Sequence, residues 1–284
     1  MKASYQKDDD LLADIKQARE SGDSGIWWLG QSGFLVVTPA VSILFDPYLS
    51  GSLTNKYAST DKPHVRVTEQ VIDPAKLTGI DIITSSHNHT DHLDAETLHP
   101  LFEANPQAKL LCPRANRDFI LDRLGAEHAE RLVELNAGEA IELSGTTFHG
   151  ITAAHNKVDR DEVGNCKFMG FVAEIGELSL YHSGDTLLHE GLEESLKAFA
   201  PDIAFLPING NKPERRVAGN LNSEEAAKLG RSIDAGLVIP HHFDMFEFNT
   251  ADPADFEAAC ASAGQACRTL GNGEGFLILN THDE

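Results

Sequence analysis

The amino-acid sequence predicts one α/β domain over residues 1–284, and three observations support this fold class. The chain is long enough to bury a large core. Strand-like apolar runs alternate with helical patterns, most clearly in the last quarter of the chain. No sequence repeat, low-complexity tract or Pro/Gly/Ser-rich linker divides the chain into two parts.

The N-terminal part is predicted to form one helix followed by three strands. Residues 8–20 carry apolar side chains on one helical face, at Leu11, Leu12, Ile15 and Ala18. The strands that follow are separated by Gly-Gln-Ser and Pro-Ala turns and are expected at Gly25–Leu29, Gly33–Thr38 and Ser42–Phe45. Residues 46–73 are polar and are predicted to form a long surface loop, which in compact domains is usually functional or mobile.

The rest of the chain is predicted to contain both strands and helices. Further strands are expected at Ile80–Thr84, Lys109–Cys112, Ala140–Leu143, Thr147–Thr152, Phe168–Ile175, Leu178–His182, Ile203–Leu206, Leu237–Pro240 and Gly275–Leu279. Helices are expected at Asp94–Ala104 and Asn116–Leu124. A later helix begins at Asn222 or Ser223 with Glu225 behind it, and another begins with Asp252 as N-cap and Pro253 in its first position.

Charge and cysteine content exclude several classes of protein. Asp and Glu number 44 against 23 Lys and Arg, so the formal net charge is −21. This balance disfavours nucleic acid and membranes as partners, because both attract Lys/Arg-rich surfaces. The acid-rich N-terminus does not resemble a secretory signal, no apolar run is long enough to span a bilayer, and the four cysteines show no CxxC spacing. We therefore predict a cytoplasmic protein with reduced thiols.

The strongest functional motif is His-Asn-His-Thr-Asp-His at residues 87–92, directly after a predicted strand. His87 and His89 are two positions apart and can point the same way to bind one cation. Asp91 and His92 lie on the turn into the next helix and can reach a second cation nearby. Imidazole and carboxylate ligands suit zinc, manganese or iron, so this segment predicts a metal site.

Further strand ends carry residues of the same kind. His155, Asp185 and His242 each follow a predicted strand closely. Side chains in such positions converge over the edge of a sheet, where loops carry function. His241 is an alternative to His242, because the two are adjacent and only one can face the site.

The order and spacing of these residues resemble those of the metallo-β-lactamase fold hydrolases. The segments IWWLGQSGFLV and FDPYLS match the opening strands of that superfamily. WWLG, YHSGD and VIPHHFD, followed by NTADP, are most similar to its L-ascorbate-6-phosphate lactonase branch. His155 is a departure, because that branch lacks a histidine there. The resemblance implies a four-layer αβ/βα sandwich, with two mixed sheets face to face and helices outside.

The resemblance also implies two divalent metal ions, zinc or manganese, and their ligands. The ligands of the first ion would be His87, His89 and His155, those of the second would be Asp91, His92 and His242, and Asp185 would bridge the two. The catalytic residues would be Asp91, which is both ligand and base, and Asp46. Asp46 fits the superfamily's buried aspartate, which accepts a hydrogen bond from a ligand imidazole.

These assignments predict a metal-dependent hydrolase in which a hydroxide bridging two cations attacks the substrate. The substrate would be a small phosphorylated or carboxylated molecule, most concretely a sugar-acid lactone. The alternatives are a phosphodiesterase acting on a small or lipid phosphodiester, a di-iron site with redox chemistry, and a metal-binding scaffold without catalysis. The sequence does not determine the oligomeric state, and a homo-oligomer is one of the alternatives.

The loops around the metals are expected to determine the substrate. A basic cluster in the acidic chain is a candidate anion clamp, and its residues are Asn211, Lys212, Arg215 and Arg216. A solvated loop with an internal Glu214 pair is the alternative. Tyr48, Gly51–Thr60 and Asn156–Asn165 are candidate walls of the cleft. Of the remaining histidines, His189 is a candidate for the cleft, His182 is expected to support a ligand, and His64, His99, His128, His149 and His282 carry no partner pattern.

Overall fold

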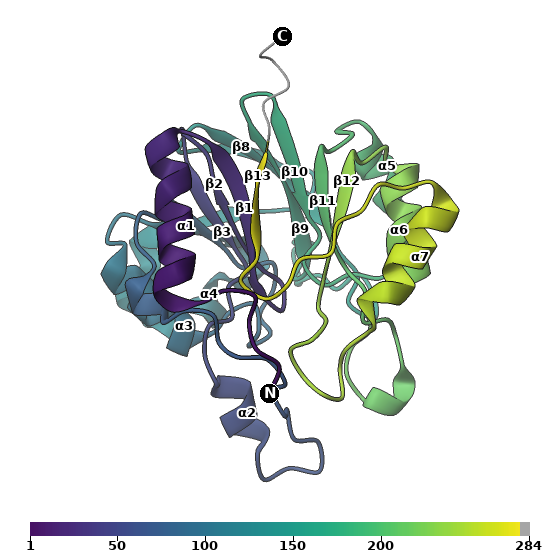
Figure 1. The fold of residues 1–284 in the computed structure, drawn as a ribbon, viewed down its shortest axis with the longest axis horizontal. Helices are drawn as coiled ribbons and strands as arrows, with labels where there is room; N and C mark the ends of the chain where they lie inside the picture. The colour runs from purple at the N-terminus through teal and green to yellow at the C-terminus, as the bar shows by residue number, and fades with distance from the viewer. Residues whose placement is uncertain (279–284) are drawn as a thin grey trace.

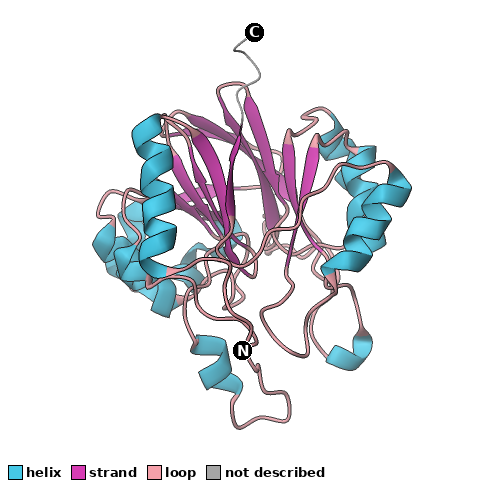
Figure 2. Cartoon of the chain, in the orientation of Figure 1, coloured by secondary structure: helices cyan, strands magenta, loops and turns pink. Residues whose placement is uncertain are grey.

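The computed structural model describes residues 1–278 and shows two β-sheets packed face to face with helices on their outer faces (Figures 1 and 2). This arrangement confirms the predicted αβ/βα sandwich. No helix in the described range combines the length and apolar character that a bilayer crossing requires.

The first sheet contains strands from the N-terminal half of the chain and the last described strand. Its strands are β1 (Ser24–Gly30), β2 (Gly33–Val37), β3 (Ser42–Phe45), β4 (Ile82–Thr84), β5 (Lys109–Pro113), β6 (Leu132–Leu135) and β13 (Gly275–Ile278), in the spatial order β13-β1-β2-β3-β4-β5-β6. Pairing is antiparallel from β13 to β3 and parallel from β3 to β6. Helices α1 (Asp8–Ser21), α3 (Ala95–Ala104) and α4 (Arg117–Leu124) lie on its outer side (Figure 1).

The second sheet contains the remaining strands. They are β7 (Ala140–Leu143), β8 (Thr146–Thr152), β9 (Met169–Ile175), β10 (Leu178–His182), β11 (Ile203–Pro207) and β12 (Leu237–His241), in the spatial order β12-β11-β10-β9-β8-β7. Pairing is antiparallel from β7 to β10 and parallel from β10 to β12. Helices α5 (Leu192–Lys197), α6 (Ser223–Ser232) and α7 (Pro253–Ala263) cover its outer side (Figure 1).

Aromatic side chains fill the space between the sheets. Phe34 and Phe205 come from facing sheets, and their ring centroids are 4.3 Å apart. Trp28 points into this core, whereas Trp27 points to the opposite face of β1, as successive strand residues do. The Trp27 indole donates to Asp14 Oδ2 on α1 at 2.7 Å. Both tryptophans are therefore core residues, and the Trp27 hydrogen bond joins α1 to the sheet.

Two predicted helix starts are confirmed by their capping contacts. The Asn222 side chain accepts from the Glu225 backbone N–H at 3.0 Å, and the Glu225 carboxylate accepts from the Asn222 N–H at 2.9 Å. This capping box makes the earlier of the two predicted positions the N-cap of α6. Asp252 caps α7 by accepting from the Ala254 N–H at 3.0 Å, with Pro253 in the first helical position.

Residues 46–73 differ from their prediction as a surface loop. Residues 46–50 are buried, and a short helix, α2 (Ser52–Tyr57), follows them. The sequence patterns did not predict α2, β6 or α5, which have four to six residues each. Short 3-10 turns lie at Pro74–Lys76 (η1), Arg114–Asn116 (η2), Ala126–Arg131 (η3) and Pro213–Arg215 (η4). Leu279, in the predicted last strand, and His282 lie outside the described residues.

The four cysteines are free thiols in the structure. Cys112, Cys166 and Cys260 are buried, and Cys267 is half-buried. Burial raises the pKa of Cys112 to about 12, so this thiol is unreactive at neutral pH.

Candidate metal centre

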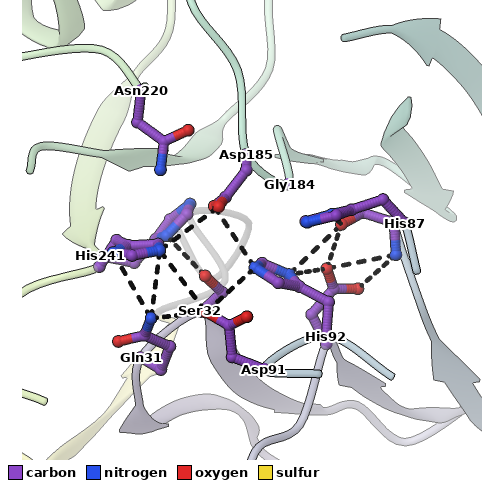
Figure 3. A network of polar contacts seen from close by, with 12 residues as sticks. Gln31, Ser32, His87, Asp91, His92, Gly184, Asp185, Asn220 and His241 are labelled. Atoms are coloured by element: carbon purple, nitrogen blue, oxygen red, sulfur yellow. Dashed lines mark hydrogen bonds and ion pairs between the residues drawn. The ribbon is translucent and has the colours of Figure 1, made fainter. Parts of the chain in front are cut away.

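Four loops meet near one another, each after the end of a strand. The loop after β4 carries residues 87–92, and the loops after β8, β10 and β12 carry His155, Asp185 and His242. Parallel pairing from β10 to β12 brings the carboxyl ends of these strands to the same edge. The structure thus brings all seven predicted ligand side chains together, and Figure 3 shows part of the group.

The first half of the centre consists of His87, His89 and His155, whose ligand atoms lie within 4.8 Å of one another. His155 Nδ1 donates to the Gly219 carbonyl at 3.0 Å, which leaves Nε2 available for a cation. Burial lowers the pKa of His89 to about 4 and the pKa of His87 well below its usual range. These two imidazoles are therefore neutral at pH 7, the state that binds a metal.

The second half consists of Asp91, His92 and His242, whose ligand atoms also lie within 4.8 Å of one another. Asp91 Oδ2 is 3.7 Å from His242 Nε2 and 3.8 Å from His92 Nε2. Burial disfavours a charged imidazole, but Asp185 and Asp91 outweigh it and raise the pKa of both His92 and His242. A cation bound in this half would replace the protons of His92 and His242, so its binding should release protons.

Asp185 lies between the two halves. Its Oδ1 is 3.4 Å from His92 Nε2, and its Oδ2 is 3.3 Å from His242 Nε2 and 3.6 Å from His155 Nε2. Burial alone would raise the pKa of this carboxyl, but His242 and His92 hold the pKa well below its usual range. One ionised carboxylate thus lies close to imidazoles of both halves, which is the placement that a bridging ligand requires.

Asp46 is fully buried and adopts a positive φ of 38°. His92 Nδ1 lies 2.7 Å from Asp46 Oδ2, so the carboxylate orients this imidazole with its Nε2 toward the other ligands. Asp46 Oδ1 accepts from Thr84 Oγ1 at 2.7 Å and from the Ser86 N–H at 3.0 Å, and Ser86 Oγ donates to Oδ2. Burial opposes ionisation of Asp46, but its contact with His92 lowers the pKa overall. This placement suits the supporting role predicted for it.

The donor atoms of the centre fit divalent cations. Several buried polar atoms of the described residues have no hydrogen-bond partner, and His87 Nε2, His92 Nε2 and Asp185 Oδ1 are among them. Buried polar atoms normally have partners, and all three of these belong to the predicted ligand set. Nitrogen and oxygen ligands without a thiolate suit zinc or manganese.

His241 and His182 lie behind the centre. Their rings stack with centroids 5.2 Å apart and an interplanar angle of 8°. His182 Nε2 donates to the Ser32 carbonyl at 2.8 Å while its Nδ1 accepts from the Gly184 N–H at 3.1 Å, so this imidazole is neutral and structural. His241 Nδ1 lies 3.1 Å from Ser32 Oγ. His242 is therefore the member of the adjacent pair that faces the centre.

The centre opens into a cleft of about 510 Å³. Part of its wall comes from α2 and the residues after it, including Lys56, Tyr57, Lys62 and His64. His64 stacks on Tyr57 with ring centroids 4.2 Å apart, although the sequence assigned it no role. Arg123 on α4 also lines the cleft. Lys56 and Tyr57 belong to Gly51–Thr60, which the sequence predicted as a wall of the cleft. Lys62, His64 and Arg123 were missed, because no local pattern links them and only the packing of separate loops brings them together.

Of the five residues predicted to contact the substrate, Arg216 lines this cleft and the other four do not. Asn211 and Lys212 line a separate groove beside α6 and α7. The Arg215 guanidinium turns inward and donates to the carbonyl of residue 250 at 2.7 Å. Tyr48 is buried, and its hydroxyl accepts from the backbone N–H of residue 53. The basic run is thus divided, and Arg216, at the end of η4, has a positive φ of 54°.

Two other predicted walls also lie elsewhere. Asn156–Asn165 does not reach the cleft, and Asn156 Oδ1 instead accepts from the Gly219 N–H at 2.9 Å. The two ring nitrogens of His189 lie 3.0 Å from the backbone carbonyls of Glu190 and Thr152. Their polar groups are thus used in local contacts rather than in the cleft.

Cation binding is expected to stabilise the chain against heat. A ligand that binds only the folded state at about 100 times its Kd adds about 2.7 kcal/mol. For a chain of this size that corresponds to a rise in Tm of roughly 4–6 °C. Calorimetric scans of chelator-treated protein with and without added zinc or manganese would measure it. Identical Tm values would contradict a cation site in this centre.

Comparisons with known proteins agree with this geometry. A family model described as the beta-lactamase superfamily domain matches residues 42–243, which include all seven predicted ligands. A UPF0173 metal-dependent hydrolase from Methanopyrus kandleri is 27% identical over 247 residues, which cover 84% of this chain and 92% of the relative.

Solved structures share the fold. A metallo hydrolase from the hyperthermophilic archaeon Ignicoccus hospitalis matches with a TM-score of 0.66 at 21% identity, covering 91% of this chain and 99% of that one. A metallo-β-lactamase fold protein from Bacillus subtilis matches with a TM-score of 0.63 at 16% identity, covering 90% of this chain and all (100%) of that one. At these identities the likeness concerns the fold alone.

Proposed function

Because this chain belongs to the metallo-β-lactamase superfamily, we propose that it is a binuclear metal-dependent hydrolase of a small anionic molecule, most concretely a sugar-acid lactone. The observation that carries this proposal is the set of nitrogen and oxygen ligands in two halves, with Asp185 between them, beside a cleft. Similarity to UPF0173 metal-dependent hydrolases supports hydrolysis. The resemblance of YHSGD and VIPHHFD to the lactonase branch supports the lactone.

The protein residues would hold the cations and handle the nucleophile's proton. Two bound divalent cations would supply an activated water and polarise the electrophilic carbonyl or phosphorus. Asp91 would orient the nucleophile and accept its proton. Burial opposes ionisation of Asp91, but His92 and His242 lower its pKa overall, so the carboxylate is in the ionised form that can accept a proton.

Cationic side chains around the cleft favour an anionic substrate. The cleft is lined by Lys56, Lys62, Arg123 and Arg216, and the acidic residues lining it within the described chain are Asp91 and Asp185, both predicted ligands. The rest of the protein is strongly acidic, so an anion has few other cationic surfaces to bind. The anion clamp is therefore proposed at these four residues rather than along 211–216.

A substrate screen tests the function. Purified protein loaded with zinc or with manganese would be offered sugar-acid lactones, with and without a phosphate group, and small and lipid phosphodiesters. Opening of a phosphorylated or carboxylated lactone is the expected result. Cleavage of phosphodiesters alone would favour the phosphodiesterase alternative. Cation binding with no hydrolysis in either panel would favour a metal-binding scaffold and contradict the enzyme.

Removing the charge of Lys56 is expected to weaken substrate binding. Its ammonium lies 5.3 Å from the Tyr57 ring centroid at the cleft wall, where it can reach an anion. Loss of a charged hydrogen bond of about 1.5–3 kcal/mol should raise KM in Lys56→Met at least tenfold with little change in kcat. Lys228→Met is the matched control, because Lys228 pairs with Glu224 on α6, outside this cleft. Equal KM values for the wild type and Lys56→Met would argue against this clamp.

A further inference from the structure

The turn between β1 and β2 holds a buried glutamine in an unfavourable backbone conformation. Gln31 has a φ of +50° and is 1% exposed. Its carbonyl oxygen accepts from the Trp28 indole N–H at 3.0 Å and from the His242 backbone N–H at 3.0 Å. His242 itself has a φ of +62°. Non-glycine residues at positive φ persist where the surrounding structure determines them, and they cluster at functional sites.

The next residue ties the same turn to the second sheet. The Ser32 carbonyl accepts from His182 Nε2 at 2.8 Å, and Ser32 Oγ lies 3.1 Å from His241 Nδ1. The turn is thus bonded to the ends of both β10 and β12. This tertiary network determines where the Gln31 side chain points, and it points into the second half of the centre (Figure 3).

The Gln31 carboxamide lies against two predicted ligands. Its Nε2 is 2.8 Å from Asp91 Oδ2 and 3.1 Å from His242 Nε2. Its Oε1 is buried and, among the described residues, has no hydrogen-bond partner. Without a cation, the amide N–H group is the end that suits the Asp91 carboxylate, to which it donates. With a cation held by Asp91 and His242, an N–H group there would face positive charge.

Half a turn of the amide exchanges its two ends, which are similar in size. That rotation would place Oε1 beside the atoms of Asp91 and His242 that bind the cation, and it would give the unpartnered oxygen a partner. Amide oxygens are metal ligands and suit harder divalent cations such as manganese. Building on the binuclear centre proposed above, we propose that Gln31 is an additional ligand of the cation held by Asp91, His92 and His242.

Calorimetric titration of the metal-free full-length chain with manganese tests this assignment. The wild type is expected to bind two cations. Gln31→Met, which offers neither amide oxygen nor N–H, should lose at least about tenfold in affinity for one of them and keep the other. Gln31→Glu, which offers an oxygen but no N–H, should retain both affinities. Thermal unfolding without metal would show whether the variants are folded. If Gln31→Met does not fold, Gln31→Glu still tests the assignment, because a loss of affinity in that variant would contradict an oxygen ligand.

A matched control separates the loss of this carboxamide from the loss of any buried carboxamide. Gln265 is 6% exposed, and its Nε2 donates to the carbonyls of Ala235 and Ala266, outside the cleft. Gln265→Met should destabilise the fold but bind manganese as the wild type does.

Three outcomes contradict a proposal, and they are distinguishable. Unchanged affinities in Gln31→Met would overturn the assignment of Gln31 and leave the binuclear centre intact. An equal loss in Gln31→Glu and Gln31→Met would also overturn it, because the N–H group rather than the oxygen would then matter. A wild-type chain that binds one cation would contradict the binuclear function. In that case the assignment of Gln31 as a ligand would stand only if Gln31→Met lowered the affinity for the single cation.

Discussion

Asp185→Asn is expected to abolish hydrolysis and to disturb cation binding in both halves of the centre. Asp185 lies 3.3–3.6 Å from one imidazole of the first half, His155, and from two of the second, His92 and His242. An asparagine of the same shape removes the negative charge and places an N–H group beside cations or imidazoles. Mutation of a residue that only supports a metal ligand typically lowers metal affinity or activity about 10–100-fold. Mutation of a ligand shared by both cations should therefore lower activity by more than about a hundredfold.

Cation titration and hydrolysis rates together would measure the effect of Asp185→Asn. Asp202→Asn is a matched control, because the exposed Asp202 carboxylate accepts from the Ser179 N–H at 2.8 Å, away from the centre. The control should bind cations and turn over substrate as the wild type does. If Asp185→Asn retained both cations and more than a tenth of the activity, a bridging role for Asp185 would be wrong.

Asp46→Ala is expected to have the largest effect on stability. The Asp46 carboxylate has no exposed surface and contacts His92 Nδ1, Thr84 Oγ1 and both the N–H and the hydroxyl of Ser86. Alanine leaves these groups buried without their acceptor. Removing one partner of a buried charged pair typically costs about 3–5 kcal/mol. Denaturant unfolding of the metal-free protein should therefore show a loss of that size.

A second measurement tests whether Asp46 also acts on the centre. With Asp46 absent, His92 is no longer oriented, so cation affinity should fall about 10–100-fold. Asp81→Ala is a suitable control, because the exposed Asp81 carboxylate accepts from the Ser42 N–H at 2.8 Å at a distance from the ligands. A stability loss in Asp46→Ala without any change in cation affinity would limit Asp46 to a role in folding.

The predicted ligands could be found from the sequence because they lie at strand ends. The strand Ile82–Thr84 is a short apolar run, and His87–His92 follows it within a few residues, so the local pattern already places four side chains at one sheet edge. The parallel strands β10 and β12 deliver Asp185 and His242 to the same region by topology alone. Their identity as ligands stays a prediction until cation binding is measured.

The substrate cleft could not be predicted in the same way. The run 211–216 is continuous in sequence, but its side chains separate in space, and Tyr48 packs into the fold. His64 and Lys62 reach the cleft from a segment that follows a helix with too few residues to show a period. The local sequence around Gln31 predicts only a turn. Its contact with Asp91 joins positions 60 residues apart, so no local pattern could predict it.

The periods in the sequence predicted the α/β class, and the resemblance of its motifs predicted the sandwich and the ligand set of the candidate centre. Strand and helix periods, caps and strand-end residues are local features, and local chemistry is sufficient to place them. The tertiary structure alone decided two things: which basic residues line the cleft, and where the Gln31 carboxamide points. Each depends on positive-φ backbone or on hydrogen bonds between distant loops, because long-range packing, not local preference, determines those conformations.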